Sequence, residues 1–72
     1  MTHKKGRRLA LYVWDGNPVR IALALRRRGF DVRVDGRHII FETPAYPYAV
    51  NHALRRYMLN AGRTVSYSLV RL

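Results

Sequence analysis

The chain has 72 residues, no cysteine, and 14 lysines and arginines against 4 acidic residues, which gives a formal net charge of +10. This length allows one small domain, and the lack of cysteine excludes disulfides and thiol chemistry, as is usual in a reducing cytoplasm, where we expect the protein to act. The charge predicts attraction to nucleic acid, anionic lipid or an acidic protein surface. Because no stretch is long and apolar enough to span a bilayer, we expect no membrane partner.

The first predicted element is a strand that follows a basic arm. Residues 1–8, MTHKKGRR, are polar and basic and predict a flexible arm, which leaves residues 9–72 for the single domain. The next six residues, LALYVW, alternate strictly, as in a half-buried strand. Its inward side carries Leu9, Leu11 and Val13. Its outward side carries Ala10, Tyr12 and Trp14.

A helix is predicted after this strand. Asn17 is a suitable helix cap, and Pro18 fits the first helical turn, where a missing N–H costs nothing. We expect the helix to run to about Arg28 and to end at Gly29. Its buried side should carry Ile21, Ala22 and Leu25.

A β-hairpin is predicted next, because FDVRV and HIIFE flank the dipeptide Asp35-Gly36, a strong hairpin signal. With a two-residue turn at this dipeptide, the expected facing pairs are Val34 with Arg37, Val32 with Ile39, and Phe30 with Phe41. This register puts the large apolar residues of both strands on one face, whereas a shift of one residue would scatter them.

The last two predicted elements are a helix and a strand. Either Thr43-Pro44 or Pro47 sets the start of the helix, since X-Pro steps resist helical structure before them. Gly62 should end it, and its buried stripe should comprise Val50, Ala53, Leu54, Tyr57 and Ala61. RTVSYSLVRL then alternates as a strand with Val65, Tyr67 and Leu69 inward.

The order β-α-β-β-α-β predicts an α+β, ferredoxin-like fold with a four-stranded antiparallel sheet and two helices on one face. It also explains why Ala-Leu-Arg-Arg occurs twice, at 24–27 and at 53–56. Each half of the fold needs a helix with an apolar side on the sheet and a basic side in water. The first and third strands should lie at the centre, so that Tyr12 and Trp14 neighbour His38 and Ile40.

The face of the sheet that no helix covers is the first candidate surface. Its expected side chains are Tyr12, Trp14, Arg33, His38, Ile40, Glu42, Ser66 and Ser68. Aromatic and arginine side chains on an open sheet form a stacking platform for unpaired bases. The alternatives are that Trp14 covers the edge of the core while Tyr12 packs under a terminal segment, or that this face is a dimer or partner interface.

The segment LYVWDGN resembles the first-strand motif of RNA-recognition-motif domains, with Tyr12 at the position of the stacking aromatic. The resemblance implies single-stranded nucleic-acid binding and covers about six residues. On the third strand, RHIIFE replaces the Gly-aromatic-x-aromatic pattern of that family, so the stacking role extends only to Tyr12 and Trp14.

The cations of the candidate binding surface fall into four groups. The arm carries Lys4, Lys5, Arg7 and Arg8. The end of the first helix carries Arg26, Arg27 and Arg28, where cations also favour the negative helix terminus. The second helix carries Arg55 and Arg56, and the open face carries Arg33. The arm is the strongest candidate, because four cations in a flexible segment contribute nothing to folding.

We expect no enzyme, no catalytic residue, no metal and no cofactor, because the three histidines and four acidic residues show neither metal-ligand spacing nor a nucleophile motif. One alternative centres on Asp15. VWDGNPVR followed by a helix and RRGF is similar in layout to the small CRISPR-associated nucleases of the ferredoxin-like plan. This resemblance implies a magnesium ion shared by two copies of Asp15. Otherwise Asp15 opens the turn before Asn17.

In size, charge and domain plan the chain also resembles the small transcription regulators that bacteriophages make against host RNA polymerase. That resemblance implies a protein that binds a polymerase subunit and inhibits initiation or promotes antitermination, and it assigns no residues. We therefore expect a monomeric or homodimeric binding protein of the cytoplasm, the host cytoplasm if it is viral. Its expected partner is an RNA polymerase subunit or, as the alternative, nucleic acid, with no small-molecule substrate.

Overall fold

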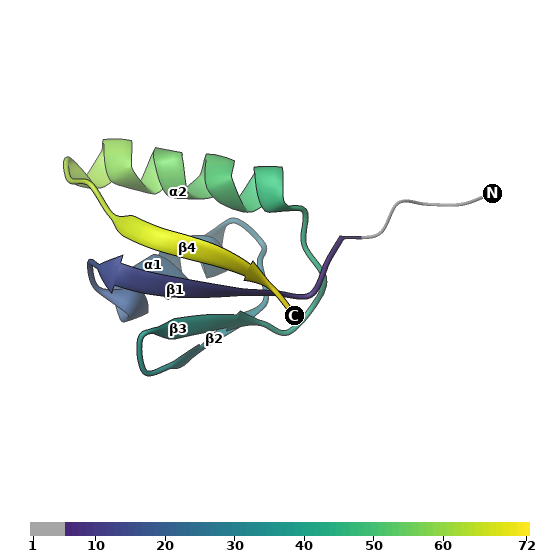
Figure 1. The fold of residues 1–72 in the computed structure, drawn as a ribbon. Coiled ribbons are helices and arrows are strands. Elements are labelled where there is room, and N and C mark those ends of the chain that lie inside the picture. The colour runs from purple at the N-terminus through teal and green to yellow at the C-terminus, as the bar shows by residue number, and fades with distance from the viewer. Residues whose placement is uncertain (1–5) are drawn as a thin grey trace.

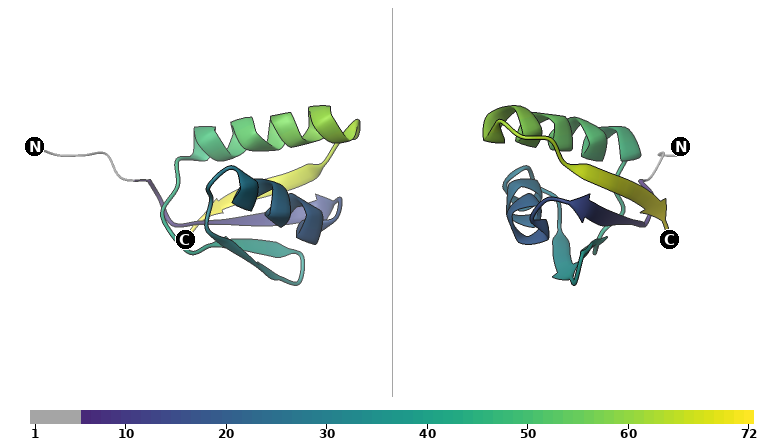
Figure 2. Two further views of the ribbon diagram at one scale, coloured as in Figure 1. Left: turned by 180° about the vertical axis from the view of Figure 1, so that it is seen from behind. Right: turned by 60° about the vertical axis from the view of Figure 1, so that its left-hand side comes forward.

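A computed structural model describes residues 6–72 of the chain and contains a four-stranded sheet and two helices (Figure 1). The elements are β1 (Leu9–Asp15), α1 (Pro18–Arg27), β2 (Val32–Asp35), β3 (His38–Phe41), α2 (Pro47–Ala61) and β4 (Ser66–Arg71). The strand order is β2-β3-β1-β4, and all neighbouring strands are antiparallel. In Figure 1, α1 lies behind the strands and α2 runs above them; in Figure 2, left, α1 lies in front of the strands. The predicted ferredoxin-like α+β fold, with β1 and β3 at the centre, is confirmed.

The first helix begins and buries its residues as predicted. The Asn17 side chain accepts hydrogen bonds from the backbone N–H of Val19, at 3.0 Å, and of Arg20, at 3.4 Å, and Pro18 is the first helical residue. Ile21, Ala22 and Leu25 are buried. The helix ends at Arg27, one residue earlier than expected, and the chain reverses at Gly29 with a φ of 95°.

The second helix begins at Pro47, which decides between the two predicted starts, and ends before Gly62, whose φ of 67° is left-handed. Val50, Ala53 and Leu54 are buried and Tyr57 is half-buried. The prediction that Ala61 continues this buried stripe is wrong. Ala61 is exposed because it faces the space between α1 and α2 rather than the sheet.

The register predicted for the hairpin is wrong by two residues. Val34 pairs with Ile39 and Asp35 pairs with His38, so the two turn residues are Gly36 and Arg37 rather than Asp35 and Gly36. Gly36 has a φ of 62°, which suits the first position of a two-residue hairpin turn of type II′. A shift of two residues keeps every side chain on its predicted face, since the side-chain period of a strand is two.

The core lies between the helices and the inward side of the sheet. Leu9, Leu11 and Val13 of β1 are fully buried beside Ile39 and Phe41 of β3. Val65 is buried, and Tyr67 and Leu69 pack against the core while half-exposed, so the predicted inward side of the last strand is confirmed. The Tyr67 hydroxyl donates to Asn51 Oδ1 at 2.8 Å and thereby ties β4 to α2.

The last residues of the predicted arm are paired with the domain. The N–H of Arg7 donates to the carbonyl of Ala45 at 2.8 Å, and the N–H of Ala45 donates back at 2.9 Å. The N–H of Leu72 donates to the carbonyl of Arg8 at 2.8 Å. Gly6 approaches so closely that an added Cβ would lie 2.6 Å from the backbone of Ala45. Lys4 and Lys5 lie outside the described residues.

Neither helix in the described part of the chain is long and apolar enough to cross a membrane.

Candidate ligand-binding surfaces

A row of three rings crosses the centre of the open sheet face. Tyr12 of β1 is directly paired with His38 of β3, as predicted, and their ring centroids are 4.9 Å apart. Trp14 lies on the other side of Tyr12, with centroids 5.8 Å apart and the rings nearly perpendicular. The prediction that Trp14 neighbours β3 is wrong, because the pairing of β1 with β3 ends at Tyr12; Ile40 faces Ala10 instead. The row therefore runs Trp14, Tyr12, His38.

Trp14 is exposed and yet fixed in orientation. The register between β1 and β4 shifts between Val13 and Asp15, which makes Trp14 the extra residue of a bulge. Bulges re-aim a side chain relative to a regular strand. The indole Nε1 donates to Ser68 Oγ of β4 at 3.0 Å, while 64% of the residue stays exposed. This exposure is contrary to the alternative in which Trp14 covers the edge of the core.

Arg37, which no pattern in the sequence identifies, holds the chain on both sides of Trp14. Its Nε donates to the carbonyl of Val13 and its Nη2 to the carbonyl of Gly16, both at 2.6 Å. The Val13 N–H in turn donates to the Arg37 carbonyl at 2.9 Å. A guanidinium is suited to this task because its planar fork offers several donors at once. The turn of the hairpin thus fixes the loop that presents Trp14.

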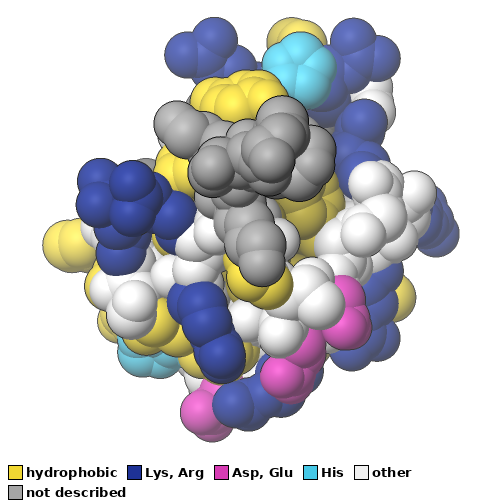
Figure 3. Space-filling model, turned by 90° about the vertical axis from the view of Figure 1, so that its right-hand side faces the viewer, with side chains coloured by type: hydrophobic (Ala, Val, Ile, Leu, Met, Phe, Trp, Pro, Cys, Tyr) yellow, Lys and Arg dark blue, Asp and Glu magenta, His cyan; other side chains and the backbone are white. Residues whose placement is uncertain are grey.

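The remaining charges of the open face are partly neutralised. Arg33 Nε lies 2.7 Å from Glu42 Oε2, so this predicted binding residue is engaged in an ion pair. Asp35 lies opposite His38 in the backbone pairing of β2 with β3, and Asp31 immediately precedes β2. Acidic side chains gather in one region of the end of the molecule shown in Figure 3, whereas lysine and arginine side chains are spread more widely. The acidic residues of this protein all belong to the sheet layer and its loops.

The helix layer has the opposite character. The sequences of α1 and α2, PVRIALALRR and PYAVNHALRRYMLNA, contain no acidic residue. The arginines on or next to these helices are Arg20, Arg26, Arg27, Arg28, Arg55, Arg56 and Arg63. Arg26 has a structural role, because its Nε and Nη2 both donate to the carbonyl of Val32, at 3.1 and 2.8 Å. The others give this side of the molecule its positive potential.

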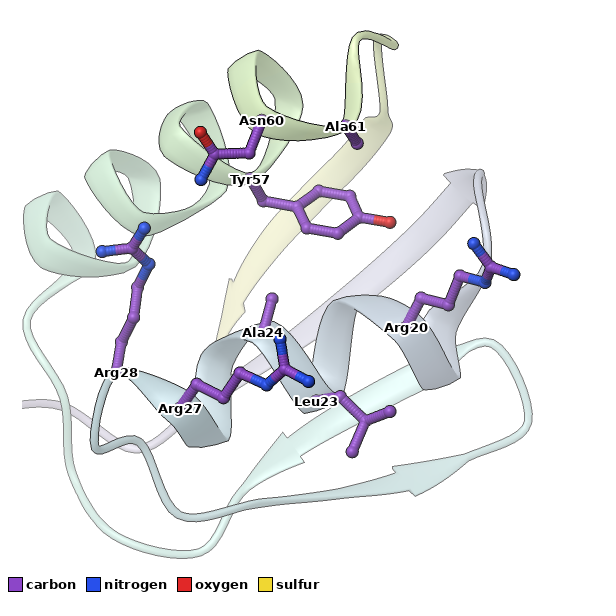
Figure 4. A pocket seen from close by; sticks show the side chains of 8 residues that line it. All are labelled: Arg20, Leu23, Ala24, Arg27, Arg28, Tyr57, Asn60 and Ala61. Carbon is purple, nitrogen blue, oxygen red and sulfur yellow. The ribbon is translucent and has the colours of Figure 1, made fainter.

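A groove of about 640 Å³ lies between α1 and α2 (Figure 4). Its lining combines cations, one amide and apolar side chains: Arg20, Arg27, Arg28, Asn60, Leu23, Ala24, Tyr57 and Ala61. In Figure 4, Tyr57 extends from α2 into the space above α1, with the three arginines around it. The structure thus brings Arg27 and Arg28 together with Arg20, which the sequence did not single out. Arg55 and Arg56 do not line this groove.

The position of Arg20 yields a stability prediction. Arg20 is in the first turn of α1, which has no acidic residue, and a cation there is next to the positive end of the helix dipole. Arg20→Glu should raise the free energy of unfolding by about 1 kcal/mol, since it reverses this interaction and places a glutamate at the capping-box position after Asn17. Thermal unfolding should show a Tm increase of roughly 4–8 °C. Arg27→Glu, at the opposite helix end, is the matched control and should lower Tm; a fall in both variants would contradict the prediction.

The acidic residues and histidines of the described part of the chain do not form a cluster of three that could hold a metal ion. Asp15 is exposed at the end of β1. Rings, guanidiniums and amides are the chemically distinctive groups of both surfaces, and these bind bases, phosphates and carboxylates.

No model of a protein family matches this chain, and no curated protein or solved structure matches it either. The chemistry of the open face and of the groove is therefore the basis for assigning a function.

Proposed function

We propose that the protein is a non-enzymatic binding domain of transcription or RNA handling, and that it binds single-stranded nucleic acid on the open face of its sheet. The observation that carries the proposal is Trp14, which is 64% exposed and held by Ser68 at the end of a row of rings. An exposed ring of fixed orientation loses little entropy when a base stacks on it. Tyr12 and His38 continue the row along the central strands.

The expected mode of binding separates stacking from charge. Stacking on an aromatic side chain contributes about 1–3 kcal/mol per base and tolerates any base, because every base has a π-face. The net charge of +10 accelerates encounter with a polyanion but does not discriminate single strands from duplexes. A preference for unpaired bases must therefore come from the rings of the open face.

The test uses the intrinsic fluorescence of Trp14, which is the chain's one tryptophan. Titration with a single-stranded oligonucleotide of about eight nucleotides should quench this fluorescence, because a stacked base contacts the indole directly. A duplex of the same sequence and salt concentration should bind at least about 10-fold more weakly, since its bases are not available for stacking. Equal affinity for strand and duplex without quenching would contradict binding on the open face.

Ionic strength gives a second measurement on the same complex. If about six phosphates are neutralised, affinity for a single strand should fall by roughly 300-fold between about 50 and 200 mM salt, a slope of about 0.7 per phosphate. Stacking on Trp14 is insensitive to salt, so the degree of quenching at saturation should not change. A salt-dependent loss of quenching at saturation would mean that charge alone holds the strand near the indole.

A protein partner, as in regulators of RNA polymerase, is the second candidate, and the outer side of α2 favours it. Tyr48 and Leu59 are 73% and 77% exposed, and Arg55 lines shallow hollows beside each of them. Exposed apolar side chains with arginine are typical of interface anchors. Affinity capture from bacterial lysate after complete nuclease digestion tests this candidate. If Leu59→Ser abolishes the retention of polymerase subunits and Trp14→Ala preserves it, the result would favour a protein partner over nucleic acid.

A further inference from the structure

We infer that the groove between α1 and α2 binds the linked phosphates of a nucleotide, that is, a nucleoside di- or triphosphate or the same group at the end of an RNA strand. The groove lies between the two helices, whereas the row of rings belongs to the face of the sheet that the helices do not cover. This site is therefore separate from the proposed strand-binding surface and does not depend on it. A nucleotide is also a ligand that the sequence did not lead us to expect.

The first argument is the charge of the groove. Arg20, Arg27 and Arg28 line it together with no acidic side chain. Among the described residues, none of their three guanidiniums takes part in a hydrogen bond or ion pair, in contrast to those of Arg26, Arg33 and Arg37. Arginine matches phosphate geometry with paired donors. Three free guanidiniums around one groove suit a ligand with several adjacent negative charges.

The second argument is that helix stability does not explain this arrangement. Cations at the end of α1 favour the helix dipole, which accounts for Arg27 and Arg28 in part. Arg20 is at the other end of the same helix, where the dipole disfavours a cation. It lies seven residues before Arg27, about two helical turns away on the same side of the helix. An arginine at an unfavourable position that shares a groove with two others indicates a ligand.

The third argument is the apolar part of the lining, which distinguishes a nucleotide from a bare anion. Leu23, Ala24 and the half-buried Tyr57 form the surface between the arginines, and Asn60 adds amide donor and acceptor groups. A volume of about 640 Å³ lies within the usual range for small-ligand sites. Ring and ribose atoms fit the apolar surface, the amide can bond a base edge, and the phosphates meet the guanidiniums.

The experiment is a titration of the full chain with ATP, AMP, adenosine and inorganic triphosphate, followed by calorimetry and by NMR amide shifts. ATP should bind at least about 10-fold more tightly than AMP and than inorganic triphosphate, because phosphates and base both contribute. The shifts should concentrate at residues 20–28 and 57–61. Binding of inorganic triphosphate as tight as that of ATP, or shifts concentrated on β1 and β3, would overturn the inference.

The variants distinguish binding in the groove from attraction by the overall charge and from effects on folding. Arg20→Glu and Arg27→Glu should each weaken ATP binding by at least about 10-fold, although they change thermal stability in opposite directions. Arg55→Glu is the matched control: the same change on α2, at a residue that lines other hollows and not the groove, should alter affinity by less than about 2-fold. Equal losses in all three variants would overturn the inference, because they would show that overall charge alone attracts ATP.

Two further measurements distinguish a free nucleotide from an RNA terminus, and the groove from the open face of the sheet. A short RNA with a 5′-triphosphate that binds more tightly than ATP, and more tightly than the same RNA with a 5′-hydroxyl, would identify a strand terminus as the ligand. Equal affinity of ATP and the triphosphate RNA would identify a free nucleotide. Trp14→Ala should leave ATP binding unchanged, whereas its loss in this variant would assign the nucleotide to the sheet and overturn the groove site.

Discussion

Replacement of Trp14 by alanine is expected to weaken the binding of single-stranded nucleic acid by roughly 5- to 150-fold, the effect of losing one base–aromatic stack. The loss is specific because the indole is oriented before the strand arrives, through the bond from Nε1 to Ser68 Oγ at 3.0 Å. Thermal stability should change little, since the residue is 64% exposed and lies outside the core. Fluorescence anisotropy with a labelled strand measures the affinity in the absence of the tryptophan signal.

The matched control is Tyr48→Ala, which removes another highly exposed aromatic residue, 73% exposed, from α2. It should leave strand affinity unchanged, because Tyr48 is in the helix layer and not on the sheet. Trp14→Phe should retain part of the affinity, because phenylalanine offers a smaller π-face and cannot form the hydrogen bond to Ser68. If Trp14→Ala and Tyr48→Ala reduce affinity equally, the open face is not the binding surface.

The fold was predictable because its signals are local. Asn17 and Pro18 define the start of α1 through contacts within one helical turn, and Gly62 ends α2 through its own backbone conformation. Alternation along β1 places Leu9, Leu11 and Val13 in the core and the half-buried Tyr12 on the open face, where the small Ala10 is nevertheless buried too. These elements occur in the order β-α-β-β-α-β, for which the ferredoxin-like sheet is a standard arrangement.

The hairpin shows that local sequence signals do not determine the pairing register of two strands. Alternation fixes which face each side chain occupies, but it is unchanged by a shift of two residues. Only the turn geometry distinguishes the two registers, and here Gly36 takes the first turn position instead of the second. The dipeptide Asp35-Gly36 located the turn to within one residue and gave the wrong pairing across it.

The features that matter most for function depend on contacts between distant segments. The bulge at Trp14 exists only in relation to β4, and Arg37 lies 24 residues from Val13. Arg20 and Asn60 meet in one groove because α1 and α2 pack side by side on the sheet. No spacing pattern along the chain indicates these contacts between distant residues. The arginines that the sequence did select also proved unequal, because Arg26 and Arg33 are occupied by intramolecular bonds.

The two surfaces divide the chemistry of the molecule. The open face offers rings and a partly neutralised charge, with Arg33 held by Glu42. The helix layer offers free guanidiniums and no acidic residue. A ligand that relies on stacking is therefore suited to the sheet, and one that relies on concentrated negative charge is suited to the groove. Removing one surface should leave the other functional, which makes the two proposals separable by mutation.

Arg37→Ala should lower the free energy of unfolding by about 2 kcal/mol, because it removes two hydrogen bonds from a charged donor. The expected loss is not larger because the bond to the Gly16 carbonyl is exposed to solvent. For a domain of this size the corresponding fall in Tm is roughly 8–16 °C. Arg37→Lys should recover only part of the loss, since an ammonium lacks the planar fork that reaches Val13 and Gly16 together. Thermal denaturation of the three proteins measures the series, and a Tm change below about 3 °C for Arg37→Ala would show that these bonds contribute little.

Arg37 should also affect strand binding without touching the strand. Its two acceptors lie on either side of Trp14, so the loosened loop of Arg37→Ala allows the indole more orientations before binding. Affinity measured well below the Tm should fall by about 3- to 10-fold, the cost of ordering one side chain. The salt dependence discriminates positioning from direct contact. A residue that binds phosphate lowers the salt slope by about 0.7 when it is removed, whereas a positioning residue leaves the slope unchanged. A reduced slope would therefore place Arg37 on the strand itself.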